Sequence, residues 1–244
     1  MNLSRPTAVV TGLLFLLTEV GAIVGMALYG PVLTSATYIT SAGSDEAILL
    51  GALFELLLVI AAVGTAVTLY PILKRQNEGL ALAYVAARVL EAAVILVGIL
   101  SLLSIVTLRR QFAGTAEGDM AALTTIGSSL VALHDWTFLF GPGFALGIGS
   151  LLLAPLMYSS RLVPRAIAVL GLAGGGLILM SAVAVLFGAY GQMSTLGLVV
   201  ALPVFAWEVS LALWLIVKGF RPVSILTTPA ARPDSEEAEL AQGT

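Results

Sequence analysis

The 244-residue chain has no cysteine and a single histidine, and only 10% of its residues are charged. Without cysteine it has no disulfide, haem thiolate, iron–sulfur cluster or thiol chemistry, and the redox compartment is left open. Lys and Arg form no stripe or patch along the sequence, so no nucleic-acid partner is expected. These absences exclude several large classes of protein before any motif is considered.

Apolar residues, in contrast, make up 59% of the chain. A soluble domain is about 45–50% apolar and about 25% charged. A chain of this length cannot bury so much apolar surface within itself, so the lipid bilayer is its expected surroundings. We therefore expect an all-α integral membrane protein.

Six segments are long and apolar enough to cross a membrane as helices, which takes about 20 residues each. The first starts like a signal peptide, but it continues past Glu19 without a cleavage signal and is expected to be retained. The six predicted spans are residues 7–30, 46–71, 79–107, 135–158, 166–189 and 195–218.

The segment before the fourth span, MAALTTIGSSLVAL at residues 120–133, has hydroxyl groups on one face. A single helix from residue 119 to residue 158 would be about 60 Å long, about twice the thickness of the hydrocarbon core. We therefore predict a separate helix along the membrane interface before the fourth span. The fold expected for residues 1–221 is a bundle of six transmembrane helices.

The charges of the loops indicate the orientation of this bundle. With both termini in the cytoplasm, eight Lys and Arg side chains fall inside and only Arg109 and Arg110 fall outside, as the positive-inside rule requires. Residues 222–244 contain prolines and a cluster of acids but no apolar period. They are predicted to form a disordered acidic tail in the cytoplasm.

Seven ionisable side chains remain at membrane depth after the loop charges are set aside. A charged group at a helix centre costs about 2.5–3.5 kcal/mol on insertion, so such residues usually mark a site. Their predicted depths converge on the middle and outer half of the bundle, which indicates one polar cavity open to the outside. The seven are Glu19, Glu55, Arg88, Glu91, His134, Asp135 and Glu208.

Arg88 and Glu91 are three residues apart and share a helix face. They form either an ion pair that only holds the third span against a neighbour, or part of a site in which Arg88 also serves Glu55 or Glu19. Five acids cannot all pair with one arginine. At least one of Glu19, Glu55 and Glu208 is therefore expected to carry a proton.

The fourth span contains the string HDWTFLFGPG. Taken alone, His134 and Asp135 suit a helix start at the membrane boundary, with Asp135 as the N-cap. Beside the other acids they suit the outer lip of the cavity. Pro142, which lies between Gly141 and Gly143, removes a backbone hydrogen bond of the helix. The helix is therefore predicted to be kinked or briefly unwound here, as a static kink or as a functional hinge.

No cofactor and no metal is expected. The chain has no E-x-x-H or H-E-x-x-H, and one histidine does not suit a zinc or bis-histidine haem site. Carboxylates with one imidazole leave magnesium, manganese, calcium or di-iron open in principle. G-x-S-x-G, the P-loop and a G-x-G-x-x-G after a strand are also absent.

Three strings of the sequence are similar to a known family, and two patterns within them, H-D-W-T-F-x-x-G-P and W-E-x-S-L-x-x-W-L, are specific. The chain resembles, from its first span to Phe220, the bacterial multipass family known as domain of unknown function 4386. The resemblance implies a six-helix membrane protein of the bacterial plasma membrane, and it implies no activity. The strings are AARVLEAAVILVGILSLLS, LHDWTFLFGPGFALGIGSLLLAPLMYSSRLVPRAIAVLGLAGG and FAWEVSLALWLIVKGF.

Three functions remain open. The preferred one is a proton-linked transporter or sensor for a small molecule or ion. The second is an intramembrane enzyme that acts on a lipid or isoprenoid, with Glu55, Glu91 and Asp135 as candidate acids and bases. The third is a non-catalytic structural or accessory protein whose polar groups only fix helix packing. The expected ligand is thus a small molecule, lipid or ion, and no protein partner is indicated.

Overall fold

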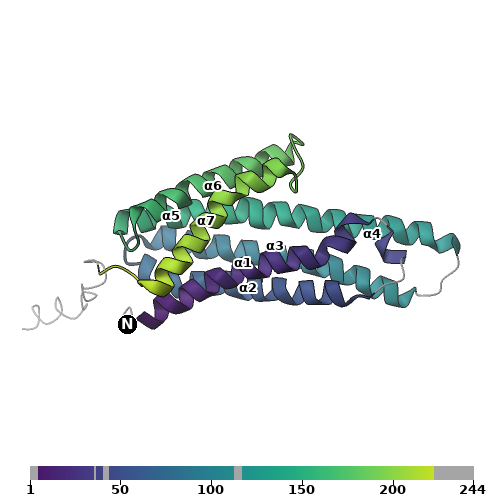
Figure 1. Cartoon of the computed structure of the whole chain (residues 1–244), viewed down its shortest axis with the longest axis horizontal. Helices are drawn as coiled ribbons and strands as arrows, with labels where there is room; N and C mark the ends of the chain where they lie inside the picture. The colour runs from purple at the N-terminus through teal and green to yellow at the C-terminus, as the bar shows by residue number, and fades with distance from the viewer. Residues whose placement is uncertain (1–4, 36, 41–43, 113–116, 223–244) are drawn as a thin grey trace, which may run out of the picture.

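A computed structural model describes residues 5–35, 37–40, 44–112 and 117–222, and these residues form helices and short connections without a strand (Figure 1). The predicted tail, residues 222–244, lies outside the described residues except for its first residue. The helices are α1 (Arg5–Thr34), η1 (Tyr38–Thr40), α2 (Glu46–Leu73), α3 (Glu78–Gln111), α4 (Glu117–Phe138), η2 (Leu139–Ala145), α5 (Leu146–Ser160), α6 (Arg165–Leu186) and α7 (Thr195–Val217).

Six helical rods in the described part of the chain are long and apolar enough to cross a membrane, as predicted. Five are single helices, namely α1, α2, α3, α6 and α7. The sixth is composite, because α4, η2 and α5 follow one another without a gap and give an apolar rod of 41 residues from Met120 to Ser160. The expected six-helix bundle is therefore confirmed.

The prediction of a separate interfacial helix is wrong, because residues 120–133 continue into the fourth span as one helix. Three of the four hydroxyls of this segment do not need an interface, since they donate to carbonyls four residues back. Thr124 donates to Met120 at 2.9 Å and Ser129 donates to Thr125 at 2.9 Å. Asp135 consequently lies inside α4, so it does not cap a helix.

The first part of α4 packs against α3 and η1. The 34 residues of α3 correspond to about 51 Å of helix, longer than the hydrocarbon core. Gly127 of α4 lies against Ile39 of η1, where a Cβ would come within 3.0 Å of the isoleucine. The α3–α4 hairpin therefore extends beyond the apolar belt as a packed unit.

The first and last helices meet at one end of the bundle, which we call the terminal end (Figure 1). Arg5 donates to the carbonyl of Ile216 at 2.7 Å and to that of Val217 at 2.9 Å. This contact agrees with an even number of crossings. The side of the membrane on which this end lies stays a prediction.

The helices α1 and α7 pack closely at the terminal end and diverge away from it. A Cβ on Gly12 of α1 would lie 2.7 Å from the carbonyl oxygen of Ala212 on α7, so these helices touch backbone to backbone. Toward the loop that joins them, α6 and α7 lean away from α1, α2 and α3 (Figure 1). A cavity lies between α1 and α7 in this region.

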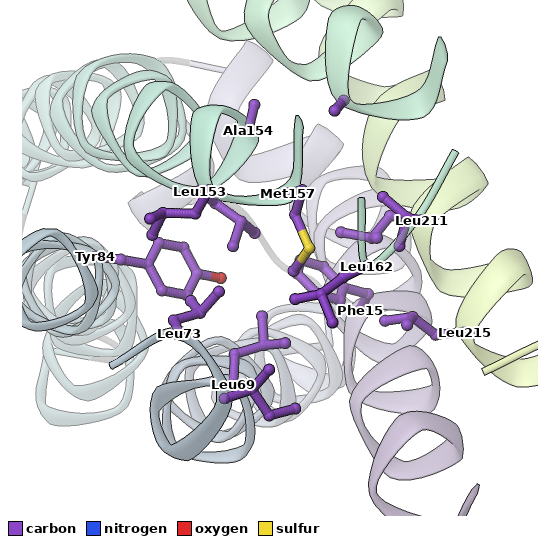
Figure 2. Close-up of a cluster of buried hydrophobic side chains, with 14 of the residues drawn as sticks. Phe15, Leu69, Leu73, Tyr84, Leu153, Ala154, Met157, Leu162, Leu211 and Leu215 are labelled. Carbon is purple, nitrogen blue, oxygen red and sulfur yellow. The ribbon is translucent and has the colours of Figure 1, made fainter. Parts of the chain in front are cut away.

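Three apolar clusters lie in the described part of the bundle, and the two larger ones occupy its two ends. The larger fills the terminal end and is drawn in Figure 2, where Phe15, Leu73, Leu153, Met157 and Leu211 converge from different helices. The second lies at the opposite end and combines Tyr29, Val32, Ile39, Ile48, Leu102, Ile105, Val106 and Leu123. The buried charges lie between the two.

Candidate functional site

Arg88 is the centre of a buried ionic cluster in the middle of the bundle. Arg88 is 1% exposed, and its Nη1 donates to Glu91 Oε2 at 3.0 Å and to Glu208 Oε1 at 3.4 Å. The guanidinium also lies 5.8 Å from the ring centre of Phe15. Glu19 completes the cluster from α1, where it interacts with both Glu208 and Arg88. Four ionisable groups from α1, α3 and α7 therefore share one site.

The charges of this cluster do not balance. One guanidinium faces the carboxyl groups of Glu19, Glu91 and Glu208, so full ionisation would leave two excess negative charges in an apolar interior. Such unpaired charges are costly in a medium of low dielectric constant. The cluster therefore suits the binding of protons or of a cationic group. The Nε and Nη2 atoms of Arg88 are also buried and have no hydrogen-bond partner among the described residues.

A cavity of about 440 Å³ lies beside this cluster, in the space between α1, η2, α6 and α7. Glu19 and Glu208 lie on its wall, and the remaining lining is mainly apolar. Ile23, Leu198 and Leu202, which also line it, are more than half exposed. Exposed apolar side chains at membrane depth face lipid, so this side of the cavity faces the bilayer, while Gln192 and Met193 line it at the connection between α6 and α7. Its volume falls in the range of about 300–1,000 Å³ that is usual for small-molecule sites.

Glu55 and His134 belong to a second, separate cluster. His134 is 2% exposed and its ring stands edge-on to Tyr29, with ring centres 5.6 Å apart. Glu55 interacts with both of these side chains. A pocket of about 20 Å³ lies against Glu55, His134 and Thr137. A pocket of this size holds about one water molecule.

Three glycines make room for this second cluster, one on each of α1, α2 and α3. A Cβ on Gly25 would lie 2.8 Å from Glu55 Cγ, and a Cβ on Gly51 would lie 2.5 Å from the ring of Tyr29. A Cβ on Gly98 would collide with the Thr137 hydroxyl. The polar side chains are therefore packed against backbone, which fixes their positions.

Asp135 points away from both clusters. Its side chain is 66% exposed, and its Oδ1 lies 3.7 Å from His134 Nδ1. It lines a third cavity, of about 270 Å³, at the opposite end of the bundle between α1, η1, α3 and α4. Ser35, Tyr38 and Ser128 give that cavity a polar lining. We call it the vestibule.

The seven predicted residues therefore do not line one cavity. Glu19, Arg88, Glu91 and Glu208 come together in one cluster, Glu55 and His134 in another, and Asp135 lies in the vestibule. Ten residues of α3 separate Arg88 from Gly98, or about 15 Å along the axis. The small pocket and the large cavity still touch, because Ala22, Phe138 and Pro142 line both.

The GPG string does not interrupt the helix. Residues Leu139–Ala145 form a π-helix, in which the turn widens and the missing N–H of Pro142 is accommodated. Gly141 lies against Ile95 of α3, and Gly143 lies against Ala182 of α6. Such turns are frequent at functional sites, and this one separates the two clusters.

Tyr29 and Phe138 are site residues that the sequence analysis did not single out. Tyr29 is fully buried beside Glu55 and His134, and Phe138 stands between the two pockets. Gly25, one turn before Tyr29, is the signal in the sequence that a neighbouring side chain packs against this face of α1, and the structure places Glu55 there. Within the described residues, no three His, Asp or Glu side chains are arranged to hold a metal ion.

Six spanning helices around buried ionisable groups define a multipass membrane protein. Residues 10–219 match the family described as Domain of unknown function (DUF4386), so the chain belongs to that family. The comparisons with curated proteins and with solved structures give no match. The family expected from the sequence is thus shown, and it assigns no molecular function.

Proposed function

We propose that this protein binds and transports an apolar molecule with a cationic head, in exchange for protons. The observation that carries the proposal is an acidic cluster with two excess carboxyl groups on the wall of an apolar cavity that faces the bilayer on one side. The apolar part of such a ligand would lie between Phe138, Leu139 and Leu202. Its cationic head would approach Glu19 and Glu208.

Protons and a cationic head compete for the same carboxyl groups in this arrangement. When the cation is absent, protons reduce the excess negative charge. When a monovalent cation binds, it replaces one of two protons, because the cation together with both protons would leave one excess positive charge beside Arg88. Differential binding of this kind is what couples two ligands.

Octyltrimethylammonium is a suitable probe, since it is permanently charged and cannot carry protons itself. We expect it to be retained by the protein in phosphatidylcholine nanodiscs, above the amount retained by empty nanodiscs. Ala201→Phe puts a ring into the cavity, whereas Val199→Phe puts the same ring on a lipid-exposed position of the same helix. Retention should fall at least tenfold in Ala201→Phe and stay unchanged in Val199→Phe. Equal retention in both variants would show that the cavity is not the site.

Exchange is tested in proteoliposomes that enclose a pH-sensitive dye. Inward movement of octyltrimethylammonium should drive protons outward, so the interior becomes more alkaline. The double variant Glu19→Gln/Glu208→Gln removes the carboxyl groups on the cavity wall and should abolish this signal. A signal of wild-type size in the double variant would contradict proton exchange at these residues.

The same cavity also suits acid–base chemistry on a lipid, because Glu19 and Glu208 both line it. Mass spectrometry of membrane lipids after incubation with the protein distinguishes the two functions. Binding without chemical change supports transport, and a converted lipid that disappears in Glu208→Gln supports an enzyme.

The distribution of Lys and Arg supports a terminal end in the cytoplasm and, by the resemblance to a bacterial family, a position in the plasma membrane. The cavity would then lie in the half of the bilayer away from the cytoplasm.

A further inference from the structure

The carboxyl groups of the large cavity need a source of protons, and the terminal end does not provide one. There, Phe15, Leu73, Met157 and Leu211 close the bundle with apolar packing (Figure 2). The lining toward lipid is apolar, whereas Gln192 and Met193 extend the cavity to the connection between α6 and α7. A separate route leads toward the opposite end of the bundle.

A chain of polar groups leads in that direction. The small pocket shares Ala22, Phe138 and Pro142 with the large cavity, so the two are separated only by these side chains. Glu55 and His134 line the small pocket. On the far side of His134, Asp135 lies 3.7 Å from its Nδ1 and lines the vestibule.

Two buried polar atoms along this chain have no partner in the described structure. They are His134 Nδ1 and the Tyr29 hydroxyl oxygen, from residues that are 2% and 0% exposed. Buried polar atoms nearly always find a hydrogen bond, from protein or from water. The small pocket has space for about one water molecule and polar groups to bind it. His134 Nδ1 faces Asp135 and can take a proton from that side. A water in the small pocket would lie between the ring and Glu55, because both residues line it.

We propose that Asp135, His134 and Glu55 form a proton pathway from the vestibule, through one water in the small pocket, to Glu55, beside the wall that the small pocket shares with the large cavity. This inference rests on the proposed function for its purpose, but its geometry and its test do not depend on it. The imidazole takes a proton on one ring nitrogen from the Asp135 side and releases one from the other nitrogen. The water passes that proton to the Glu55 carboxylate. No bond other than those to the proton changes.

The groups that face His134 come from every helix around it. Tyr29 faces it from α1, Glu55 from α2, and Asp135 is its neighbour on α4. From α3 the described contact is Gly98, which carries no titratable group. The state of the imidazole is consequently set by two carboxyl groups, one on each side of it. The widened turn at Pro142 ends the pathway at the wall of the large cavity.

Histidine NMR tests the pathway directly, because the chain has only one histidine. The protein is labelled with 15N-histidine, purified through a tag without histidine, and studied in detergent between pH 5 and pH 8. We expect the imidazole signals to change with pH within this window, because protons that move along the pathway pass through the ring. The midpoint of this change should move in Glu55→Gln, because a carboxyl group that faces the ring is removed. Ser128→Ala, which changes the vestibule without removing a charge, should leave the midpoint as it is.

Asp135→Asn tests the outer step of the pathway. Proton exchange should slow, so that separate signals for the two forms replace one averaged signal. Signals that stay constant from pH 5 to pH 8 in the wild type would overturn the proposal. So would a midpoint and line shape that are the same in Glu55→Gln, Asp135→Asn and wild type. Size-exclusion elution as for the wild type shows that each variant is folded.

The outcomes separate this inference from the proposed function. Responsive His134 signals without binding of octyltrimethylammonium would contradict only the function. Binding of that probe with unresponsive His134 signals would contradict only the pathway.

Discussion

Replacing Arg88 by methionine is the most informative perturbation of the ionic cluster. Arg88→Met keeps much of the side-chain length and removes the only positive charge that the described structure places near Glu91 and Glu208. Both carboxyl groups are then buried without a partner, since Glu91 and Glu208 are each 5% exposed. Breaking a buried ion pair in this way costs about 3–5 kcal/mol. We expect the free energy of unfolding, measured by titration with sodium dodecyl sulfate in mixed micelles, to fall by this amount at pH 8.

The matched control neutralises the whole cluster. In the triple variant Arg88→Met/Glu91→Gln/Glu208→Gln no charge of the ion pairs remains, and such replacements are often neutral or even stabilising. Its stability should therefore lie within about 2 kcal/mol of the wild type. The deficit of the single variant should also shrink toward pH 5, since protonation removes the unpaired charges. A single variant as stable as the wild type, or a triple variant as unstable as the single one, would refute the charge argument.

Two further predictions concern packing and orientation. A Cβ on Gly171 would lie 2.6 Å from the indole of Trp207, whereas a Cβ on Gly176 would meet nothing within 4 Å. Gly171→Ala should therefore lower the free energy of unfolding by about 1–3 kcal/mol in the same titration. An effect no larger than that of Gly176→Ala would contradict the described contact between α6 and α7. Because the chain has no cysteine, single variants Glu78→Cys and Met193→Cys report the two ends of the bundle without background. With the terminal end in the cytoplasm, a membrane-impermeant maleimide added to intact cells should label Met193→Cys but not Glu78→Cys, and the reverse pattern would invert the orientation.

The architecture could be predicted because it depends on local properties of the sequence. Length and apolar content identify each span, and both are visible without knowing what the span packs against. The fourth rod was the exception. Its Ser and Thr side chains resemble the polar face of an interfacial helix, yet Thr124 and Ser129 bond to their own backbone. A hydroxyl on a helix can satisfy itself, so polarity alone did not mark a boundary.

The residues of the site could be named but not assembled from the sequence. The i, i+3 spacing of Arg88 and Glu91 gave their ion pair, which the structure contains. The approach of Glu19 to Glu208 depends on α1 packing against α7, a contact between helices nearly 200 residues apart. One residue step along α4 turns the side chain by about 100°, and this sends His134 inward and Asp135 outward. The sequence gives the depth of each residue in the membrane, and depth alone could predict neither the contact of Glu19 with Glu208 nor the opposite directions of His134 and Asp135.

The central claim is that a cationic head is recognised by the acidic cluster, and one comparison tests it most directly. Octyltrimethylammonium, octanol and octanoate have the same apolar chain and differ in the charge of the head. Their dissociation constants are measured with the wild type and with Glu208→Gln in nanodiscs, each corrected for partition into empty nanodiscs.

The wild type should bind the cation at least tenfold more tightly than octanol, a difference of about 1.4 kcal/mol, and octanoate most weakly. Glu208→Gln should lose most of this preference while its affinity for octanol stays the same. Equal affinities for the three compounds, or an unchanged preference in Glu208→Gln, would contradict the account.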